Sequence, residues 1–208
     1  MIKNIIFDIG GVLVEFSPEN ILRKMGLPET EVLEIAKTTS LGPHWKELDR
    51  GVMSKEEVFE LMLSETKEEY KADARHFLYD EVLSTVKSFD YSEEWLRELK
   101  SRGYNIYLLT NYPDWMFDYH WTNTFTFTKS VDGKVVSAVV KQIKPDEEIY
   151  TTLLKKYNLI PEESVFIDDK AENIQTAKAL KINGIQFTNI NDVKNKLNSL
   201  LENQNTIL

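Results

Sequence analysis

Residues 3–14 have the sequence KNIIFDIGGVLV, and this stretch determines how the rest of the chain is interpreted. An apolar run rich in Ile and Phe, ended by an acidic residue and two glycines, is typical of a buried strand that carries Asp8 at its carboxyl end. Ligands of open α/β sheets bind at that end, and a glycine-rich turn lets backbone N–H groups approach an anion. The stretch therefore predicts that Asp8 is a nucleophile for phosphate chemistry.

The size and charge of the chain limit the possible function classes. Its 208 residues are enough for one good hydrophobic core and a smaller second one. The formal net charge of −9 argues against a nucleic-acid-binding surface, because such a surface needs clustered Lys and Arg side chains. The sequence contains no cysteine, which excludes disulfides, thiolate metal sites and a cysteine nucleophile.

The hydropathy pattern predicts a soluble protein. No stretch reaches the roughly 18 apolar residues that a membrane span needs. Asp8 and Glu15 interrupt the apolar N-terminal run before any small-residue cleavage site, so the run is not typical of a signal peptide. We expect a cytoplasmic protein that binds neither membranes nor nucleic acid, and the sequence leaves its oligomeric state open.

The order of the predicted elements indicates an α/β fold. From residue 88 onward, helix patterns alternate with buried strands, which we predict at 105–109, 164–167 and 184–187. A turn signal at Asp132-Gly133 suggests a hairpin or a short loop beside the sheet. Strand and helix alternation of this kind predicts a parallel sheet covered by helices.

A helical insert interrupts this fold. Between residues 16 and 87 the sequence has helix signals, such as the capping box formed by Ser54 and Glu57, and no convincing strand. We therefore predict a discontinuous core made of residues 1–15 and 88–208, with residues 16–87 as a separate helical unit.

Three predicted strands end in polar residues. Asp8 follows the first, Thr110-Asn111 the second and Asp168-Asp169 the third, so parallel strands would bring these side chains into one crevice. Lys144, just before a helix that begins at Pro145, can supply a cation there. Carboxylates, a hydroxyl, an amide and one Lys suit the Mg²⁺-assisted handling of a phosphate.

Four segments, taken in order, resemble the motifs of the haloacid dehalogenase-like (HAD) phosphohydrolase superfamily. They are FDIGGV at 7–12, LLTN at 108–111, KPDEEIY at 144–150 and VFIDD at 165–169. The resemblance implies a Rossmann-like three-layer core with an inserted helical cap, as in subfamily I. It also implies a cytoplasmic Mg²⁺-dependent phosphomonoesterase that acts on a small phosphorylated metabolite such as a sugar phosphate.

The same resemblance implies roles for single residues. Asp8 matches the nucleophile that forms an aspartyl-phosphate, and it binds the metal together with the backbone carbonyl of Gly10. The phosphate-binding residues it implies are Thr110, Asn111 and Lys144, and Lys144 also contacts the nucleophile. Asp169 matches the Mg²⁺ ligand of the fourth motif, with Asp168 and Asn173 in support. Strand alternation does not decide between the two aspartates, so Asp169 is preferred on the family pattern alone.

One position departs from the pattern of most phosphatases in the superfamily. They carry a second Asp two residues after the nucleophile, where its side chain protonates the leaving group, but this chain has Gly10. General acid–base catalysis is typically worth ~10²–10⁴-fold, so we expect a preference for good leaving groups and expect Gly10→Asp to raise the turnover of poor ones. A bacterial glucose-1-phosphate phosphatase-like subgroup also has Gly here, which makes an active enzyme the expectation.

Some candidates lie outside the motifs. His44 and Trp45 interrupt the helices of the insert and are candidate substrate-specificity residues, although the simpler expectation is that Trp45 packs inside the insert and His44 faces water. The aromatic residues between 112 and 121 more often form a core or an interface than a sugar-stacking surface.

Two other functions remain possible from the sequence. A 2-haloacid dehalogenase would use the same Asp8 against carbon and would need no acid at Gly10. A catalytically weak module that only binds a phosphate ligand is the second alternative.

Overall fold

The computed structural model describes residues 1–203 of the chain, so residues 204–208 of the predicted core lie outside the described part. Its strands are β1 (Asn4–Phe7), β2 (Val14–Phe16), β3 (Val86–Ser88), β4 (Asn105–Thr110), β5 (Gly133–Val136), β6 (Ser164–Asp168) and β7 (Asn183–Gln186). Its α-helices are α1 (Pro18–Lys24), α2 (Glu29–Thr38), α3 (Trp45–Arg50), α4 (Lys55–Glu65), α5 (Lys71–His76), α6 (Ser92–Ser101), α7 (Asp114–Asn123), α8 (Ser137–Val140), α9 (Glu147–Tyr157), α10 (Ala171–Ala179) and α11 (Ile190–Asn203).

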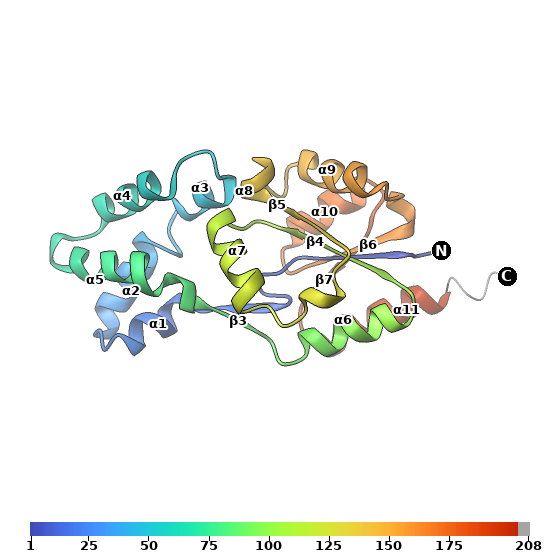
Figure 1. Cartoon of the computed structure of the whole chain (residues 1–208), viewed down its shortest axis with the longest axis horizontal. Helices are drawn as coiled ribbons and strands as arrows, with labels where there is room; N and C mark the ends of the chain where they lie inside the picture. The colour runs from blue at the N-terminus through green and yellow to red at the C-terminus, as the bar shows by residue number, and fades with distance from the viewer. Residues whose placement is uncertain (204–208) are drawn as a thin grey trace.

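The central feature is a parallel sheet in the order β5-β4-β1-β6-β7 (Figure 1). β1 lies in the middle and is buried along its whole length, as the apolar run around it predicts. It pairs with β4 on one side and β6 on the other, and Phe7 is in register with both Leu108 and Ile167. The three strands therefore end side by side, and the residues that follow them share one edge of the sheet.

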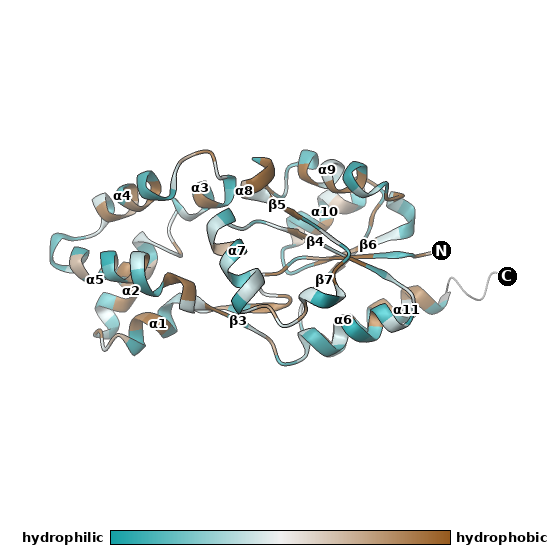
Figure 2. Cartoon of the chain, in the orientation of Figure 1, coloured by the Kyte–Doolittle hydropathy of each residue, from teal (hydrophilic) through white to brown (hydrophobic). Residues whose placement is uncertain are grey.

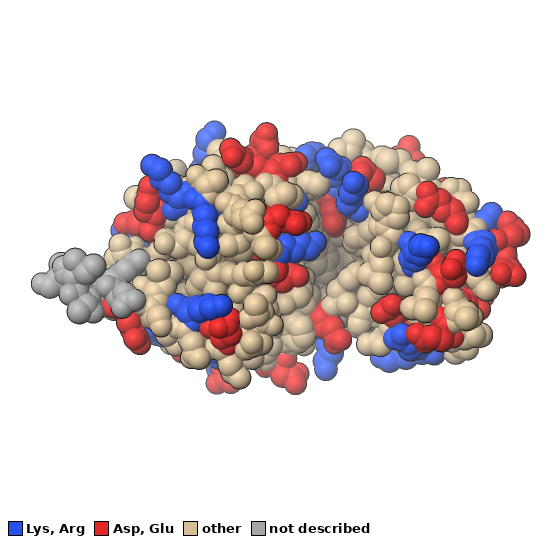
Figure 3. Space-filling model, turned by 180° about the vertical axis from the view of Figure 1, so that it is seen from behind, with Lys and Arg blue, Asp and Glu red and all other residues tan. Residues whose placement is uncertain are grey.

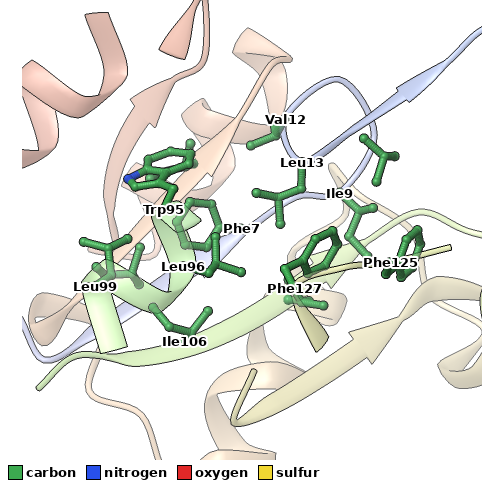
Figure 4. Close-up of a cluster of buried hydrophobic side chains, with 14 of the residues drawn as sticks. Phe7, Ile9, Val12, Leu13, Trp95, Leu96, Leu99, Ile106, Phe125 and Phe127 are labelled. Carbon is green, nitrogen blue, oxygen red and sulfur yellow. The ribbon is translucent and has the colours of Figure 1, made fainter. Parts of the chain in front are cut away.

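Helices cover both faces of the sheet and make a three-layer fold. On one face, Phe7 packs with the buried residues of α6, including Trp95 and Leu96 (Figure 4). The buried residues of α11 belong to the same core. On the other face, Ile6 and Phe166 pack against α9 and α10. The brown stretches in Figure 2 lie along the strands and on one side of several helices, as expected for helices that bury an apolar face. The predicted α/β parallel-sheet architecture is confirmed.

The segment between β2 and β3 forms a second lobe, built from α1 to α5 and called here the cap lobe (Figure 1). It has its own apolar core, which includes Leu22, Ile35, Phe59 and Phe77. β2 and β3 pair antiparallel where the chain leaves and re-enters the larger lobe. These short strands fall at the ends of the segment predicted to be helical.

The region around Asp132-Gly133 differs from the prediction of a hairpin or loop. Residues 133–136 form β5, which pairs parallel with the end of β4. Gly133 serves close packing here, because an added Cβ would lie 2.4 Å from the ring of Tyr157. The Asp132 carboxylate accepts a hydrogen bond from the backbone N–H of Ile106 at 2.7 Å and so fixes the start of the edge strand. A turn signal thus marks the beginning of a strand that is too short to be recognised by alternation.

No helix within residues 1–203 has both the length and the apolar character needed to cross a bilayer.

Candidate active site

Asp8 lies directly after the central strand, at the carboxyl edge of the sheet. Its backbone N–H donates to the carbonyl of Ile167 at 2.9 Å, which continues the ladder between β1 and β6. The backbone N–H of Ile9 donates to Asp8 Oδ1 at 2.7 Å. The carboxylate is therefore held in one orientation, with only 7% of the residue exposed.

Lys144 connects two of the predicted acidic residues. Its Nζ lies 2.9 Å from Asp8 Oδ1 and 2.7 Å from Asp168 Oδ2, and its side chain is 2% exposed. Burial alone would lower the pKa of Lys144, but the charges of Asp8 and Asp168 outweigh it and raise that pKa above its ordinary value. Lys144 is thus a fixed cation between the ends of β1 and β6.

Asn111 positions the backbone of Lys144. Its Oδ1 accepts a hydrogen bond from the Lys144 N–H at 2.8 Å, and its Nδ2 donates to the Lys144 carbonyl at 3.0 Å. Thr110 is 1% exposed, and its hydroxyl donates only a long contact of 3.5 Å to the Asn111 carbonyl. The second and third predicted motifs therefore meet at the same edge as Asp8.

The two consecutive aspartates have different surroundings. Asp168 is fully buried and accepts hydrogen bonds from Lys144 Nζ, from Asn173 Nδ2 and from the Lys170 backbone N–H. Asp169 Oδ1 is screened from solvent and has no hydrogen-bond partner among the described residues. Hydrogen bonds to the chain thus occupy Asp168, whereas Asp169 has an oxygen left for a further ligand.

The three carboxylates form a cluster of negative charge. Ligand oxygens of Asp8, Asp168 and Asp169 lie within 4.8 Å of one another. Burial raises the pKa of Asp8 to about 6, because loss of hydration and the nearby Asp168 outweigh the attraction of Lys144. Burial and Asp168 likewise raise the pKa of Asp169. One Lys does not balance three close carboxylates, so this set of oxygens, with an unpaired one on Asp169, fits a divalent cation.

A cavity of about 400 Å³ opens above these residues, between the larger lobe and the cap lobe. Figure 3 shows the surface hollowed between the two lobes on the face seen from behind. The cavity is lined by Asp8, Gly10, Gly11, Val14, Phe16, Ser40, Trp45, Asp49, Val86, Asn111, Tyr112, Pro113, Met116, Lys144, Asp169, Lys170 and Asn173. Most predicted site residues therefore surround one space, whereas Thr110 and Asp168 lie behind its wall.

The two candidates in the insert have different positions. Trp45 lines the cavity and packs against Phe16, with ring centroids 5.4 Å apart. His44 does not line it, because its Nε2 lies 2.8 Å from Glu65 Oε1 within the cap lobe. Most of the aromatic residues after the second motif belong to the core or pack against it, whereas Tyr119 is exposed. The His120 ring is hydrogen-bonded to the hydroxyl of Tyr112 and to the carbonyl of Leu83.

Asp49 is a cavity residue that sequence reasoning missed. It lies on α3, four residues after Trp45 and so on the same helix face. Burial raises its pKa to about 7. The i, i+4 spacing from Trp45 is the one sequence signal that points to it, and no motif marks it.

The comparisons with known proteins agree with this architecture. A family model described as haloacid dehalogenase-like hydrolase matches residues 2–181. Because this match spans most of the chain, the protein belongs to the haloacid dehalogenase-like hydrolases. The predicted family, and with it the prediction of a hydrolase, is confirmed.

Two relatives are similar over nearly their whole length. Sesquiterpene phosphatase astK of Aspergillus oryzae is 28% identical over 188 residues, which cover 89% of this chain and 90% of that protein. D-ribitol-5-phosphate phosphatase of Bacteroides thetaiotaomicron is 27% identical over 219 residues, which cover 97% of this chain and 99% of that protein. Among solved structures, a HAD family enzyme of B. thetaiotaomicron in complex with magnesium and inorganic phosphate has a TM-score of 0.69. It is 21% identical in sequence, and the match covers 90% of this chain and 95% of that chain. This structural likeness supports the same fold.

Proposed function

We propose that this protein is a Mg²⁺-dependent phosphomonoesterase that forms an aspartyl-phosphate on Asp8 and acts on a small phosphorylated metabolite, such as a sugar phosphate. The observation that carries the proposal is the bridge from Lys144 to Asp8 and Asp168, beside the unpaired oxygen of Asp169. The two relatives named above are both called phosphatases, and the structural neighbour was solved with magnesium and phosphate. All three agree with the chemistry of the site.

The residues divide into those that hold the metal and those that hold the phosphate. Asp8, Asp169 and the backbone carbonyl of Gly10 would bind Mg²⁺, which supplies charge stabilisation to the transferring phosphoryl group. Asn111 and Lys144, at the same sheet edge, would contact the phosphate. The buried Asp168, together with Asn173, would keep Lys144 in place. Thr110 would contribute to phosphate binding at the rear of the site.

In the first step the free oxygen of the Asp8 carboxylate attacks phosphorus, and the bond from phosphorus to the leaving oxygen breaks. Asp8 Oδ1 is already engaged with Lys144 and the Ile9 N–H, so Oδ2 is the attacking atom. Water then attacks phosphorus, which releases phosphate and restores the carboxylate. Closure of the cap lobe, residues 16–87 in the proposed domain division, would exclude bulk water from both steps.

The size of the cavity suits a small substrate. About 400 Å³ suits a metabolite of modest size. Its walls combine the polar edge of the sheet with the side chains of Phe16, Trp45 and Met116, so the group that carries the phosphate meets a partly apolar surface. Trp45 is the proposed specificity residue of the cap lobe, while His44 would act only through its contact with Glu65.

A cytoplasmic location and a small-molecule partner are part of the proposal. A chain without cysteine suits a reducing compartment. On the face shown in Figure 3, acidic and basic side chains are interspersed, which is unlike the basic stripe of a nucleic-acid-binding surface.

The direct test is phosphate release from a panel of sugar, acyl, aryl and alkyl phosphates. We expect turnover with Mg²⁺ and a loss of at least about 100-fold when EDTA removes the metal, because the clustered carboxylates then repel the phosphate. Adding back Mg²⁺ serves as the control. Chloride release from 2-haloacids without Mg²⁺ would instead identify a dehalogenase. Tight phosphate binding without turnover of any panel member would identify a binding module.

The contact between Gly11 and Asp169 gives a second prediction. Gly11 has φ +70°, and an added Cβ would lie 3.1 Å from Asp169 Oδ2. We expect Gly11→Ala to displace this carboxylate and to raise the Mg²⁺ concentration for half-maximal activity by about 10-fold or more. Gly103→Ala is the matched control, because Gly103 also has a positive φ, of +90°, but open space around it. An equal Mg²⁺ requirement in both variants would contradict Asp169 as a ligand.

A further inference from the structure

The site lacks a carboxylate where most phosphatases of this family place their proton donor, and the space for one is open. Gly10 lines the cavity, and a Cβ built on it would meet no heavy atom within 4 Å. Asp8 is committed to attack, and the described hydrogen bonds of Asp168 hold Lys144 and Asn173. A proton for the leaving oxygen must therefore come from another wall of the cavity.

Asp49 is an acid on the opposite wall with no other evident task. It is part of α3 and lines the same cavity as Asp8 and Gly10. Its Oδ1 is screened from solvent and has no hydrogen-bond partner within residues 1–203. Leaving a buried carboxylate oxygen unpaired costs free energy, so such an atom calls for an explanation.

Hydrogen bonds hold the backbone around Asp49 against the larger lobe. This end of α3 therefore keeps its position beside the cavity. Ser137 Oγ donates to the Asp49 carbonyl at 2.6 Å and accepts from the Tyr112 N–H at 2.9 Å. Lys141 Nζ donates to the carbonyl of Gly51. Gly51 ends α3 with φ +62°, and an added Cβ would lie 2.5 Å from the Ala138 carbonyl oxygen. The end of α3 thus packs directly on α8, and the cap lobe presents Asp49 to the cavity.

From this geometry we propose that Asp49 donates the proton to the leaving oxygen, in place of the carboxylate that Gly10 lacks. The inference rests on the proposed phosphatase function. When Asp8 attacks and the bond from phosphorus to oxygen breaks, the protonated Asp49 gives its proton to that oxygen, and an alcohol leaves. The Asp49 carboxylate then takes a proton from the water that attacks the aspartyl-phosphate, so phosphate is released and both carboxyl groups return to their starting states.

The surroundings of Asp49 suit both halves of this cycle. Burial raises its pKa to about 7; the charges of Lys170 and Lys144 only partly oppose this rise, and the charge of Asp8 adds to it. A carboxyl group with such a pKa is present in both protonation states near neutrality, which is the condition for acting as acid and then as base. With this donor the enzyme accepts alkyl phosphates, such as primary sugar phosphates, as well as esters with good leaving groups.

The test compares Asp49→Asn with the unmodified protein on esters of different leaving groups. We expect kcat/KM for alkyl phosphates to fall by about 10²–10³-fold, and kcat/KM for p-nitrophenyl phosphate to fall by less than about threefold, because p-nitrophenolate needs no proton. A plot of log kcat/KM against leaving-group pKa should be steeper for Asp49→Asn than for the unmodified protein. Glu47→Gln, the same chemical change on α3 outside the cavity, should match the unmodified protein.

A second variant separates catalysis from structure. Gly10→Asp, added to Asp49→Asn, should restore at least about tenfold of the lost alkyl phosphate turnover, because it places a carboxyl group two residues after Asp8. When Asp49 is present, Gly10→Asp should raise alkyl phosphate turnover by a smaller factor. An equal loss on all esters, or no loss, overturns the role of Asp49 while leaving the phosphatase intact. An unmodified protein that hydrolyses no ester with Mg²⁺ overturns both proposals.

Discussion

Asp8→Asn is expected to lower kcat by about 10⁴–10⁶-fold, the range seen when an enzyme loses its nucleophile. The amide has nearly the shape of the carboxylate, and its oxygen can still accept the hydrogen bond from the Ile9 N–H. It carries no charge, so it neither attacks phosphorus nor attracts Lys144 and the metal as the carboxylate does. The measurement is p-nitrophenolate release from p-nitrophenyl phosphate with Mg²⁺.

Asp146→Asn is the matched control for this experiment. Asp146 is an exposed aspartate two residues after Lys144, and we expect its replacement to leave turnover unchanged. Equal activity of Asp8→Asn and the unmodified protein would disprove the assignment of the nucleophile. Mass spectrometry of the variant checks that slow deamidation has not regenerated Asp8.

The residues at the sheet edge could be predicted because each belongs to a local pattern. A buried strand followed by Asp8, a second followed by Asn111 and a third ending at Asp168 are visible in single short segments. The rule that parallel strands share a carboxyl edge then brings them together without any distance from the structure. The predicted sheet core and its crevice follow from these few elements.

The different surroundings of Asp168 and Asp169 could not be predicted from the sequence. Successive residues at the end of a strand differ in direction, but the sequence does not say which direction faces the ligand. The structure shows that Asp168 is buried and bonded to Lys144, and that Asp169 keeps an unpaired Oδ1 while its Oδ2 lies next to Gly11. This difference depends on contacts between separate segments, since Lys144 lies 24 positions before Asp168 and Gly11 lies in the loop after β1.

Asp49 and β5 escaped prediction for related reasons. β5 is four residues long and begins at a glycine that looks like a turn, although its place is set by the ring of Tyr157. Asp49 reaches the cavity only because α3 docks on α8 through Ser137, Gly51 and Ala138. Neither feature is marked by a motif in the sequence, since both arise from packing between distant segments.

Lys144→Met is expected to lower both activity and stability. Lys144 is the shared partner of two carboxylates whose side chains are 10% and 0% exposed, and removing one partner of a buried ion pair typically costs about 3–5 kcal/mol. At about 1.4 kcal/mol per factor of ten, the same loss at the phosphate would lower kcat/KM by about 10²–10⁴-fold. Lys155→Met, on the exposed surface of α9, is the control and should change neither property.

Mg²⁺ should repair part of the stability defect but little of the activity. A divalent cation bound by Asp8 and Asp169, close to Asp168, supplies the positive charge that the variant lacks, and a ligand that binds only the folded state stabilises it. Thermal unfolding with and without Mg²⁺ should therefore show a larger increase of Tm for Lys144→Met than for the unmodified protein. Activity does not return to the same extent, because the ammonium group that would contact the phosphate is absent. Equal Tm increases in both proteins would mean that Lys144 does not offset the charge of the metal-binding carboxylates.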